Sequence, residues 1–410
     1  MRIGIIGSGI SGLSAAWSLA AKHDVTVFES NAQAGGHAWT VDVDGEAVDL
    51  GFMVFNTVTY PELCRLFDHL GVTSRESCMS FSVRNHDASV EYQGSSLGGY
   101  FARRASLLSA AHWKMLLGIL RFNRIATRAL ADHSRPATGS FGAWCSAHRI
   151  GRRVRERFLQ PIGSSMWSCS TRDFDSFPAE FVLRFMANHR MLQLRGRPVW
   201  RTVRGGSRTY VQAMLAANRF TVECDRSVEA VSRESEGARV TFAGGDTVHF
   251  DHVVLACHAD QALAIVQNPD EVERDVLAGI PYTANDVVLH RDESLLPVRP
   301  QARASWNYRL CDHGDAATIT YDLRRLQGLR SEQPVLVTLN GSKLIDPSLI
   351  LERHVMHHPA YGPSTMQSQM RHDELIGRSG LSYCGAYWGW GFHEDGCVSG
   401  LRVSEQLNAG

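Results

Sequence analysis

The first thirty residues contain two short apolar runs with glycine-rich sequence between them. Residues 1–6 form an apolar run that predicts a strand, and residues 13–21 favour a helix. Residues 25–28 form a second apolar run of strand type. A strand, a helix and a second strand in this order predict the start of an α/β fold with a parallel sheet.

Farther along the chain, the pattern of apolar positions changes three times. Apolar residues recur at helical spacing over residues 107–130 and again over 141–158, so the segment 86–198 is expected to be helical. Residues 199–265 return to short strands, and residues 239–250 predict a hairpin with two glycines, Gly244 and Gly245, at its turn. Residues 266–375 mix loops with strands such as 335–339.

The segment between the first strand and the first helix has the pattern G-x-G-x-x-G. Gly7 allows a tight turn, Gly9 lets the backbone approach a pyrophosphate, and Gly12 lets the helix pack closely on the strand. The helix N-terminus offers free N–H groups to phosphates, and Glu29 ends the second strand, where it can accept hydrogen bonds from a ribose diol. The pattern therefore predicts a dinucleotide site. The residues expected to form it are Gly7, Gly9, Ile10, Ser11, Gly12, Glu29 and Ser30.

A second glycine pair follows in GGHAWTV, and VDLGFMVFN, RPVWRTVRGGSRTYV and YCGAYWGWGFHEDG come later. These segments resemble the superfamily of flavin amine oxidases, protoporphyrinogen oxidases and phytoene desaturases. More narrowly, they resemble bacterial proteins described only as FAD/NAD-binding or amine oxidase-like. The resemblance implies a Rossmann-type FAD-binding domain with an interleaved α+β substrate domain. The further cofactor contacts that it implies are Gly35, Gly36, His37, Gly51, Phe52, Gly205, Gly206 and Val228.

A cofactor domain that the chain leaves and re-enters implies a discontinuous architecture. We expect residues 1–85, 199–265 and 376–410 to form the FAD-binding domain, and residues 86–198 and 266–375 to form the substrate domain. No cysteine or histidine lies in a recognised flavin-attachment motif, so one non-covalent FAD is expected.

Aromatic and ionisable residues are dense in residues 387–396. The resemblance implies that this segment passes the flavin ring and that the following helix points its N-terminus at it. The residues expected to line the reactive region are Tyr387, Trp388, Trp390 and His393. His393 is either a proton-transfer group, since an ordinary histidine titrates near neutral pH, or a structural residue. Glu394 or Asp395 is expected to cap the helix, and which acid meets the ribityl chain stays open.

Three features depart from the amine oxidase pattern. Ala386 follows Gly385 where those enzymes usually have an acid, and His37 stands where they usually have arginine. Amine oxidases commonly have a lysine near the flavin, and in this sequence only Lys343, which lies in a predicted turn, could serve. Together with an apolar middle region, these departures favour a small hydrophobic substrate and desaturation or double-bond isomerisation of a fatty acyl or isoprenoid chain. The alternatives are an amine oxidase and a flavoprotein without enzymatic activity.

Composition and charge indicate which kinds of partner and which cellular location to expect. The 410 residues carry no net charge, which gives no indication of a nucleic acid partner. The nine cysteines are scattered without metal-ligand spacing, and no apolar run is long enough for a membrane span, so a cytoplasmic protein without metal is expected. Residues 103–128 mix leucines with arginines, which fits either a helix on the inner face of an anionic membrane or a core helix with a solvated arginine face. The oligomeric state is not indicated.

Overall fold

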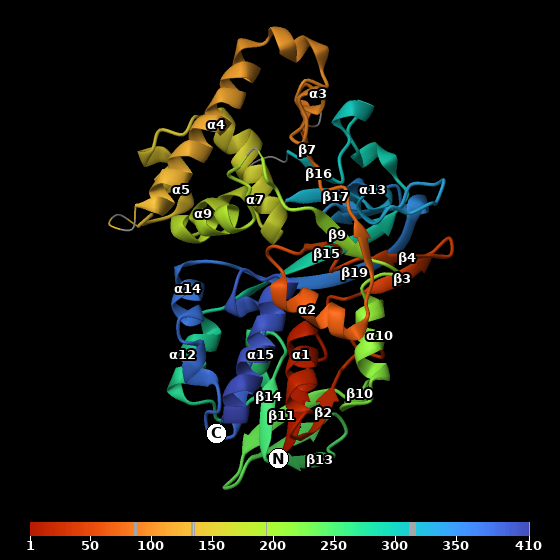
Figure 1. Ribbon diagram of the computed structural model, residues 1–410, viewed down its shortest axis with the longest axis vertical. Coiled ribbons are helices and arrows are strands. Elements are labelled where there is room, and N and C mark those ends of the chain that lie inside the picture. Colours follow the sequence, from red (N-terminus) through yellow and green to blue (C-terminus); the bar gives the residue numbers. More distant parts are fainter. Residues whose placement is uncertain (86–87, 133, 135, 194, 311–316, 410) are drawn as a thin grey trace.

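The protein is described by a computed structural model, which covers residues 1–85, 88–132, 134, 136–193, 195–310 and 317–409. The chain forms two halves stacked along the long axis of the molecule (Figure 1). The lower half contains both termini and a five-stranded parallel sheet, and the upper half contains a seven-stranded sheet and a group of helices (Figure 1).

The parallel sheet of the lower half has the strand order β10-β2-β1-β14-β20. Its strands are β1 (Arg2–Ile6), β2 (Asp24–Phe28), β10 (Thr221–Glu223), β14 (His252–Leu255) and β20 (Leu381–Tyr383). The central strands β1 and β14 are buried on both faces, which explains why their apolar residues run on without alternation. Helices α1 (Ile10–Leu19) and α15 (His393–Ala409) pack against each other so closely that a Cβ on Gly400 would lie 2.2 Å from the Ser11 carbonyl oxygen.

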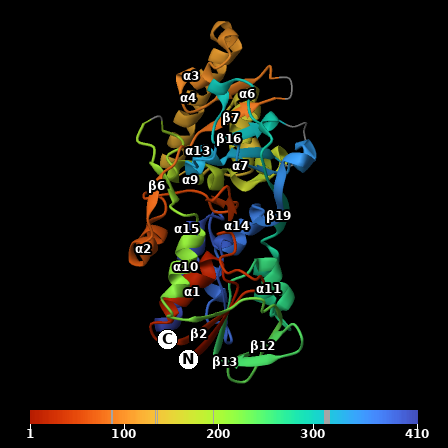
Figure 2. The same ribbon diagram turned by 90° about the vertical axis from the view of Figure 1, so that its right-hand side faces the viewer.

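An antiparallel sheet and several helices complete the lower half (Figure 2). The antiparallel strands are β11 (Val228–Arg233), β12 (Ala238–Phe242) and β13 (Thr247–Phe250). Gly244 and Gly245 form the β12–β13 turn with φ of +95° and +91°, so the predicted hairpin is confirmed. The helices are α10 (Arg208–Ala216), α11 (Ala259–Ile265), α12 (Glu271–Ala278) and α14 (Pro363–Gln369).

Short elements connect the two halves. They are β3 (Thr40–Val43), β4 (Glu46–Asp49), β5 (Phe55–Asn56), β6 (Ser74–Glu76), β9 (Trp200–Val203) and α2 (Pro61–Leu70). β3 and β4 form a hairpin, and β9 pairs with both β5 and β6.

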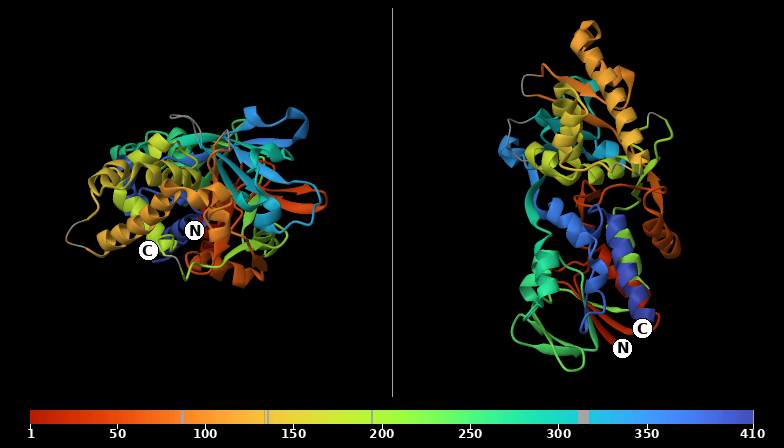
Figure 3. Two further views of the ribbon diagram at one scale, coloured as in Figure 1. Left: turned by 90° about the horizontal axis from the view of Figure 1, so that it is seen from above. Right: turned by 90° about the vertical axis from the view of Figure 1, so that its left-hand side faces the viewer.

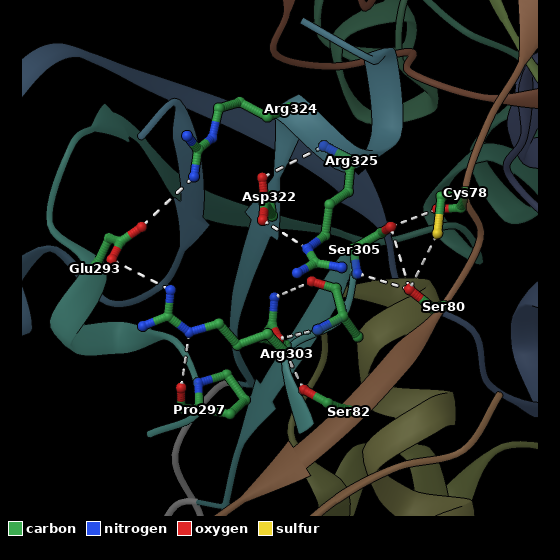
Figure 4. Close-up of polar contacts among 12 residues, drawn as sticks. Cys78, Ser80, Ser82, Glu293, Pro297, Arg303, Ser305, Asp322, Arg324 and Arg325 are labelled. Carbon is green, nitrogen blue, oxygen red and sulfur yellow. Dashed lines mark hydrogen bonds and ion pairs between the residues drawn. The ribbon is translucent and has the colours of Figure 1, made fainter. Parts of the chain in front are cut away.

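The seven-stranded sheet of the upper half has the order β19-β15-β18-β17-β16-β7-β8. Its strands are β7 (Phe81–Arg84), β8 (Glu91–Gln93), β15 (Tyr282–His290), β16 (Trp306–Arg309), β17 (Thr318–Asp322), β18 (Leu336–Leu339) and β19 (Ile350–Pro359). Polar contacts join segments that are distant in sequence, since the Ser305 N–H donates to the Ser80 hydroxyl at 2.9 Å, and they also brace the loops nearby, where Glu293 pairs with Arg303 at 3.2 Å (Figure 4).

The helices of the upper half pack over this sheet (Figure 3). They are α3 (Leu97–Tyr100), α4 (Ala110–Ala131), α5 (Phe141–Ala147), α6 (Arg152–Val154), α7 (Gln160–Trp167), α8 (Thr171–Ser176) and α9 (Ala179–Asn188). The predicted helix over 107–130 is confirmed as α4, preceded by a 3-10 turn at Arg104–Leu108. The segment 141–158 is interrupted, since α5 ends near Ala147 and Arg149 takes a left-handed φ of +51° before α6.

Sheet membership differs from the expected domain boundaries in two places. β7 lies before the boundary at residue 85, yet it pairs with β16 in the upper sheet. The segment 271–280 lies beyond the boundary at 265, yet Val276, Leu277 and Ile280 pack into the hydrophobic core of the lower half. Apolar patterning could not show these assignments, because it does not specify which core a segment joins.

Candidate cofactor and active site

The loop between β1 and α1 has the geometry of a phosphate site. Gly7 has φ of +104°, and a Cβ there would lie 2.9 Å from the Ala256 carbonyl oxygen. A Cβ on Gly12 would lie 2.0 Å from the Gly7 carbonyl oxygen, so the helix starts in backbone contact with the turn. A Cβ on Gly9, by contrast, would meet no atom within 4 Å. Open space therefore lies in front of the first turn of α1, where Ile10 and Ser11 begin the helix.

The second glycine pair lies against this loop. A Cβ on Gly36 would come 3.0 Å from the Gly9 Cα, and Gly36 itself is exposed. The Gly35 N–H donates to the Ser8 hydroxyl at 3.0 Å, and that hydroxyl donates to a Glu29 carboxylate oxygen at 2.5 Å. Two segments separated by more than twenty residues thus form one concave backbone surface.

Glu29 is buried at the end of β2, as the sequence predicts. Its carboxylate accepts from the backbone N–H of Ser8 at 3.1 Å and from the Asn31 side chain at 2.7 Å, and the Ser30 hydroxyl lies 3.3 Å away. The Ser8 hydroxyl and the Asn31 backbone N–H also donate to it, so its roughly four acceptor positions are taken, and a ribose diol would replace the Ser30 or Asn31 side chain. The Arg226 N–H donates to the Glu29 carbonyl oxygen at 2.8 Å. This contact brings the chain to Val228, the first residue of β11.

The middle of the site is organised by Asp49, a residue that the sequence analysis did not single out. Its carboxylate accepts from Thr40 at 2.6 Å, from the Ser207 N–H at 2.8 Å and from the Gln327 side chain at 2.7 Å. Burial raises the pKa of Asp49 to about 6, against the hydrogen bonds that lower it. The contacts hold the mid-chain pair Gly205-Gly206 beside β3, with a Cβ on Gly206 only 2.5 Å from Thr40. The VDLGF motif contains Asp49 and could have pointed to it, but Ser207 and Gln327, which bond to its carboxylate, lie far away in the sequence.

Gly51 and Phe52 continue this surface. The Phe52 N–H donates to the His37 carbonyl oxygen at 2.8 Å, and a Cβ on Gly51 would lie 2.2 Å from the same oxygen. The Phe52 ring stacks on His393 with centroids 3.8 Å apart. Phe52 therefore links the glycine-rich segments to the start of α15.

Histidines that the sequence analysis did not connect gather beside His37. The His37 ring lies 6.3 Å from that of His258, after β14, and 5.5 Å from that of His358, on β19. The Asn285 amide on β15 lies 3.2 Å from the His358 Nδ1 atom. Burial lowers the pKa of His37, and it lowers those of His258 and His358 to about 3, so the rings are neutral at pH 7. Over the described part of the chain, no group of three or more His, Cys, Asp or Glu side chains is arranged to hold a metal ion.

His37 also carries an unpaired buried ring nitrogen. Its Nε2 atom is buried and has no partner among the described residues. A buried ring nitrogen of this kind needs a hydrogen-bonding partner, and a cofactor hydroxyl, which can both donate and accept, would supply one. The neutral ring does not reproduce the charge of the arginine found in the resembling enzymes.

The four aromatic residues expected to line the reactive region diverge in the structure. Tyr387 is 2% exposed and packs in the core of the lower half, where the Trp388 ring stacks on His372 at 4.1 Å. Trp390 points to the upper half, and its carbonyl oxygen accepts from the Trp167 indole at 3.1 Å. The four side chains therefore do not gather in one place, and their contact with the flavin stays a prediction. The short 3-10 turn at Ala386–Trp388 rotates Tyr387 and Trp388 into the lower core, which the residue pattern did not show.

His393 is buried at the start of α15. It stacks on Phe52, and its Nε2 atom lies 2.9 Å from the Tyr210 hydroxyl. Burial lowers the pKa of His393 to about 3, so the ring is neutral at pH 7 and is not available as an imidazolium acid. The contacts give it a positioning role, and proton transfer by the neutral ring stays a prediction.

The two acids that follow have separate partners. Glu394 accepts from the backbone N–H groups of Glu62 and Leu63, both at 2.9 Å, so it caps α2. Asp395 accepts from the Phe392 N–H at 2.9 Å and caps its own helix α15. Burial raises the pKa of Glu394, and it raises that of Asp395 to about 7. No contact in the structure assigns either acid to a ribityl chain.

The surface built by these segments fits an elongated dinucleotide. Gly9, Gly36, His37, Gly51 and Gly391 are at least partly exposed, although the strands beside them are buried. The residues that would hold FAD are the glycine loop for the diphosphate, Glu29 for a ribose, and the start of α15 for the flavin. The open space at Gly9 and the unpaired His37 nitrogen are the observations that support this fit.

Comparisons with known proteins agree with this geometry. The profile of the family described as flavin-containing amine oxidoreductase matches residues 10–294. The fold is similar to that of an engineered putrescine oxidase, with a TM-score of 0.72, 17% identity, and coverage of 100% of this chain and 98% of that one. It is also similar to a putative protoporphyrinogen oxidase from Exiguobacterium sp. 255-15 (TM-score 0.72, 14% identity, 100% and 98% coverage). A fatty acid isomerase from P. acnes that produces CLA is comparable (TM-score 0.70, 15% identity, 100% and 98% coverage).

One curated relative matches over a short segment. It is a 4,4'-diapophytoene desaturase from Staphylococcus haemolyticus, 48% identical over 52 residues, which is 12% of this chain and 10% of that enzyme. Among the described helices, none is long and apolar enough to cross a membrane. The profile match covers well over half of the chain. The chain therefore belongs to the flavin-containing amine oxidoreductase family and is an FAD-dependent oxidoreductase.

Proposed function

We propose that the substrate is an apolar chain, a fatty acyl or isoprenoid compound, which the enzyme desaturates or isomerises at a double bond. The observation that carries this proposal is a small apolar void of about 10 Å³ between α7 and α9, which a substrate chain would enter by displacing the side chains around it. Its walls are apolar side chains, among them Ile162, Met166, Trp167, Phe185, Met186 and Met191.

The cavity adjoins the segment that precedes α15. The Trp167 indole donates to the Trp390 carbonyl oxygen, and the Phe185 ring stacks on Phe392 with centroids 5.3 Å apart. Residues of the cavity wall are thus in direct contact with the residues that would border the flavin. A substrate chain seated there would have one part in the cavity and one part beside the cofactor site.

The chemistry of the lining favours an apolar chain over an amine. None of the lining residues is charged, and a buried ammonium without a partner is costly. Lys343, the lysine that an amine oxidase-like site would need near the flavin, is exposed on a 3-10 turn. Methionine is unbranched and flexible, so Met166, Met186 and Met191 can rearrange to admit a chain.

The protein's own residues would bind, orient and exclude water. When bound, FAD supplies a ring that accepts a hydride equivalent from the substrate. The aromatic residues around Trp390 and Phe392 would exclude water from the reacting carbon atoms. The fatty acid isomerase and the desaturase segment among the similar proteins also support a lipid substrate. We further propose that the FAD is held without a covalent bond.

Product analysis tests this proposal. The purified holoprotein is incubated with unsaturated and branched fatty acids or with putrescine, with and without oxygen, and the products are identified by mass spectrometry. We expect a shifted or additional double bond in a lipid. Peroxide formation with the amine, together with unchanged lipids, would instead establish amine oxidation.

A pair of variants locates the substrate. Met166→Trp fills the cavity and should lower turnover of long chains roughly tenfold, the scale of a one-to-two-methylene misfit. Met79→Trp changes a partly buried methionine of the upper half outside the cavity and should turn over near the native rate. Equal rates in both variants would contradict the assignment of the cavity.

A further inference from the structure

The far end of the upper half has an apolar and basic surface that the flavin chemistry does not use. We define the tip as α3, the 3-10 turn at Arg104–Leu108 and the first half of α4, which lie at the opposite end of the molecule from both termini (Figures 1 and 3). Large apolar side chains are exposed there. They are Leu97 (71%), Leu107 (50%), Leu108 (92%), Trp113 (44%) and Leu117 (62%).

These side chains are held in place rather than loosely placed. Ser109 caps α4 by accepting from the His112 N–H at 3.3 Å. The Trp113 indole donates to the Leu107 carbonyl oxygen at 2.9 Å, which fixes the 3-10 turn against the helix. The Tyr100 hydroxyl donates to the His112 carbonyl oxygen at 3.0 Å, which attaches α3. The exposed leucines therefore lie on elements that hydrogen bonds hold in a fixed arrangement.

The two faces of α4 are different. Its buried positions, which include Met115, Ile119 and Phe122, pack into the core of the upper half. The opposite face carries Trp113, Leu117, Arg121, Arg124 and Arg128, at spacings of four, four, three and four residues. One face anchors the helix in the protein, so the other is free for an external partner.

The charge of the tip and of the rest of α4 has one sign. Residues 94–131 contain no Asp or Glu, and six Lys or Arg lie between 103 and 128. Within the part of the chain that the structure describes, none of these six has an ion-pair partner. Arg121 instead donates to the backbone carbonyl oxygens of His148 and Arg149. Exposed leucines and a tryptophan flanked by unpaired cations are complementary to an anionic lipid surface.

We propose that the tip docks the protein on an anionic membrane surface, with Leu107, Leu108 and Trp113 entering the headgroup region and Arg104 and Lys114 contacting lipid phosphates. Docking would also bring a lipid-modifying enzyme to its substrate, but the inference rests on the surface alone and holds whatever the substrate is.

Vesicle flotation tests the docking without any turnover. Holoprotein is mixed with phosphatidylglycerol-containing vesicles or with pure phosphatidylcholine vesicles at low and high salt. We expect binding to the anionic vesicles that weakens with salt, and little binding to the neutral ones. Equal binding to both, or none to either, would overturn the proposal.

Variants assign the binding to the tip. The double variant L107S/L108S should weaken binding at least about tenfold, because it removes two exposed apolar side chains. R104E/K114E should weaken it roughly fivefold or more per residue at low salt. Both pairs are exposed, so folding should be unaffected, and circular dichroism checks this. The matched control is Met370→Ser, which removes a 78% exposed apolar side chain at the end of α14 and should bind like the native protein.

Two results would overturn the assignment to the membrane. If Met370→Ser weakened binding as much as the tip variants, the contact would be non-specific. If L107S/L108S converted a native dimer to a monomer in sedimentation while leaving vesicle binding unchanged, the surface would be an interface between two copies of the chain.

Discussion

Substitution of Gly9 by valine should separate folding from cofactor binding. Gly9 has φ of −64° and ψ of 175°, which an L-residue adopts without strain, and a Cβ there meets no protein atom within 4 Å. The protein therefore has room for the side chain, and the fold should lose only about 1 kcal/mol from the poorer N-cap of α1. The valine would fill the space in front of the helix N-terminus, where the diphosphate would sit.

The expected loss of FAD affinity follows from the hydrogen bonds at stake. Two charge-assisted bonds from backbone N–H groups contribute about 1.5–3 kcal/mol each, so affinity should fall roughly 10²-fold or more. Flavin fluorescence titration of the apoprotein measures the affinity, and thermal unfolding of the apoprotein measures the stability. The holoprotein should be yellow and release FAD on denaturation, whereas Gly9→Val should purify colourless.

Gly151→Val is the matched control. Gly151 is also an N-cap, with φ of −61° and ψ of 139°, and a Cβ there likewise meets nothing within 4 Å. It should lose similar stability but bind FAD like the native protein. If Gly9→Val bound FAD with native affinity, or if Gly151→Val lost it equally, the diphosphate would not lie at the glycine loop.

Three further predictions concern the start of α15. His393→Phe keeps a ring on Phe52 but leaves the Tyr210 hydroxyl without its partner, so urea unfolding should show a loss of about 1–3 kcal/mol; a proton-transfer role predicts in addition that stopped-flow flavin reduction slows about 10²-fold. Asp395 has a folded pKa of about 7 against an ordinary 3.8, so its contribution to stability is complete below about pH 4 and is lost as the pH rises through 7. Asp395→Asn should flatten this decline, and an unchanged pH profile would contradict the raised pKa. Glu394→Ala removes the cap of α2 and should lower the unfolding free energy by about 1–2 kcal/mol, with the loss of helix N-terminal protection visible by hydrogen exchange.

The phosphate loop could be predicted from the sequence because its constraints are local. Gly7 needs a left-handed φ, and Gly12 needs backbone contact within five residues, so the spacing alone specifies the geometry. The same holds for the Gly244-Gly245 hairpin. In each case the glycines that permit the geometry and the backbone that adopts it lie in the same short segment.

The rest of the site depends on contacts between distant segments. Asp49 is bonded to Gln327, and His37 lies against His358, so no single segment indicates either contact. The Tyr387 side chain packs into the hydrophobic core of the lower half. The density of aromatic residues in 387–396 does not indicate which core each of them joins. Sheet membership of β7 was missed for the same reason, because its partner β16 follows more than two hundred residues later.

Anaerobic single-turnover mixing tests the central claim that this FAD-dependent oxidoreductase acts on an apolar chain. The native holoprotein and Met166→Trp are mixed with unsaturated fatty acyl lipid, and the flavin absorbance at about 450 nm is followed while the quenched lipid is analysed for double-bond position. The account predicts a changed double bond in the native reaction, with flavin bleaching if the reaction is a desaturation, and a slower change in Met166→Trp. Unchanged lipid, together with bleaching by putrescine at equal rates in both proteins, would contradict it.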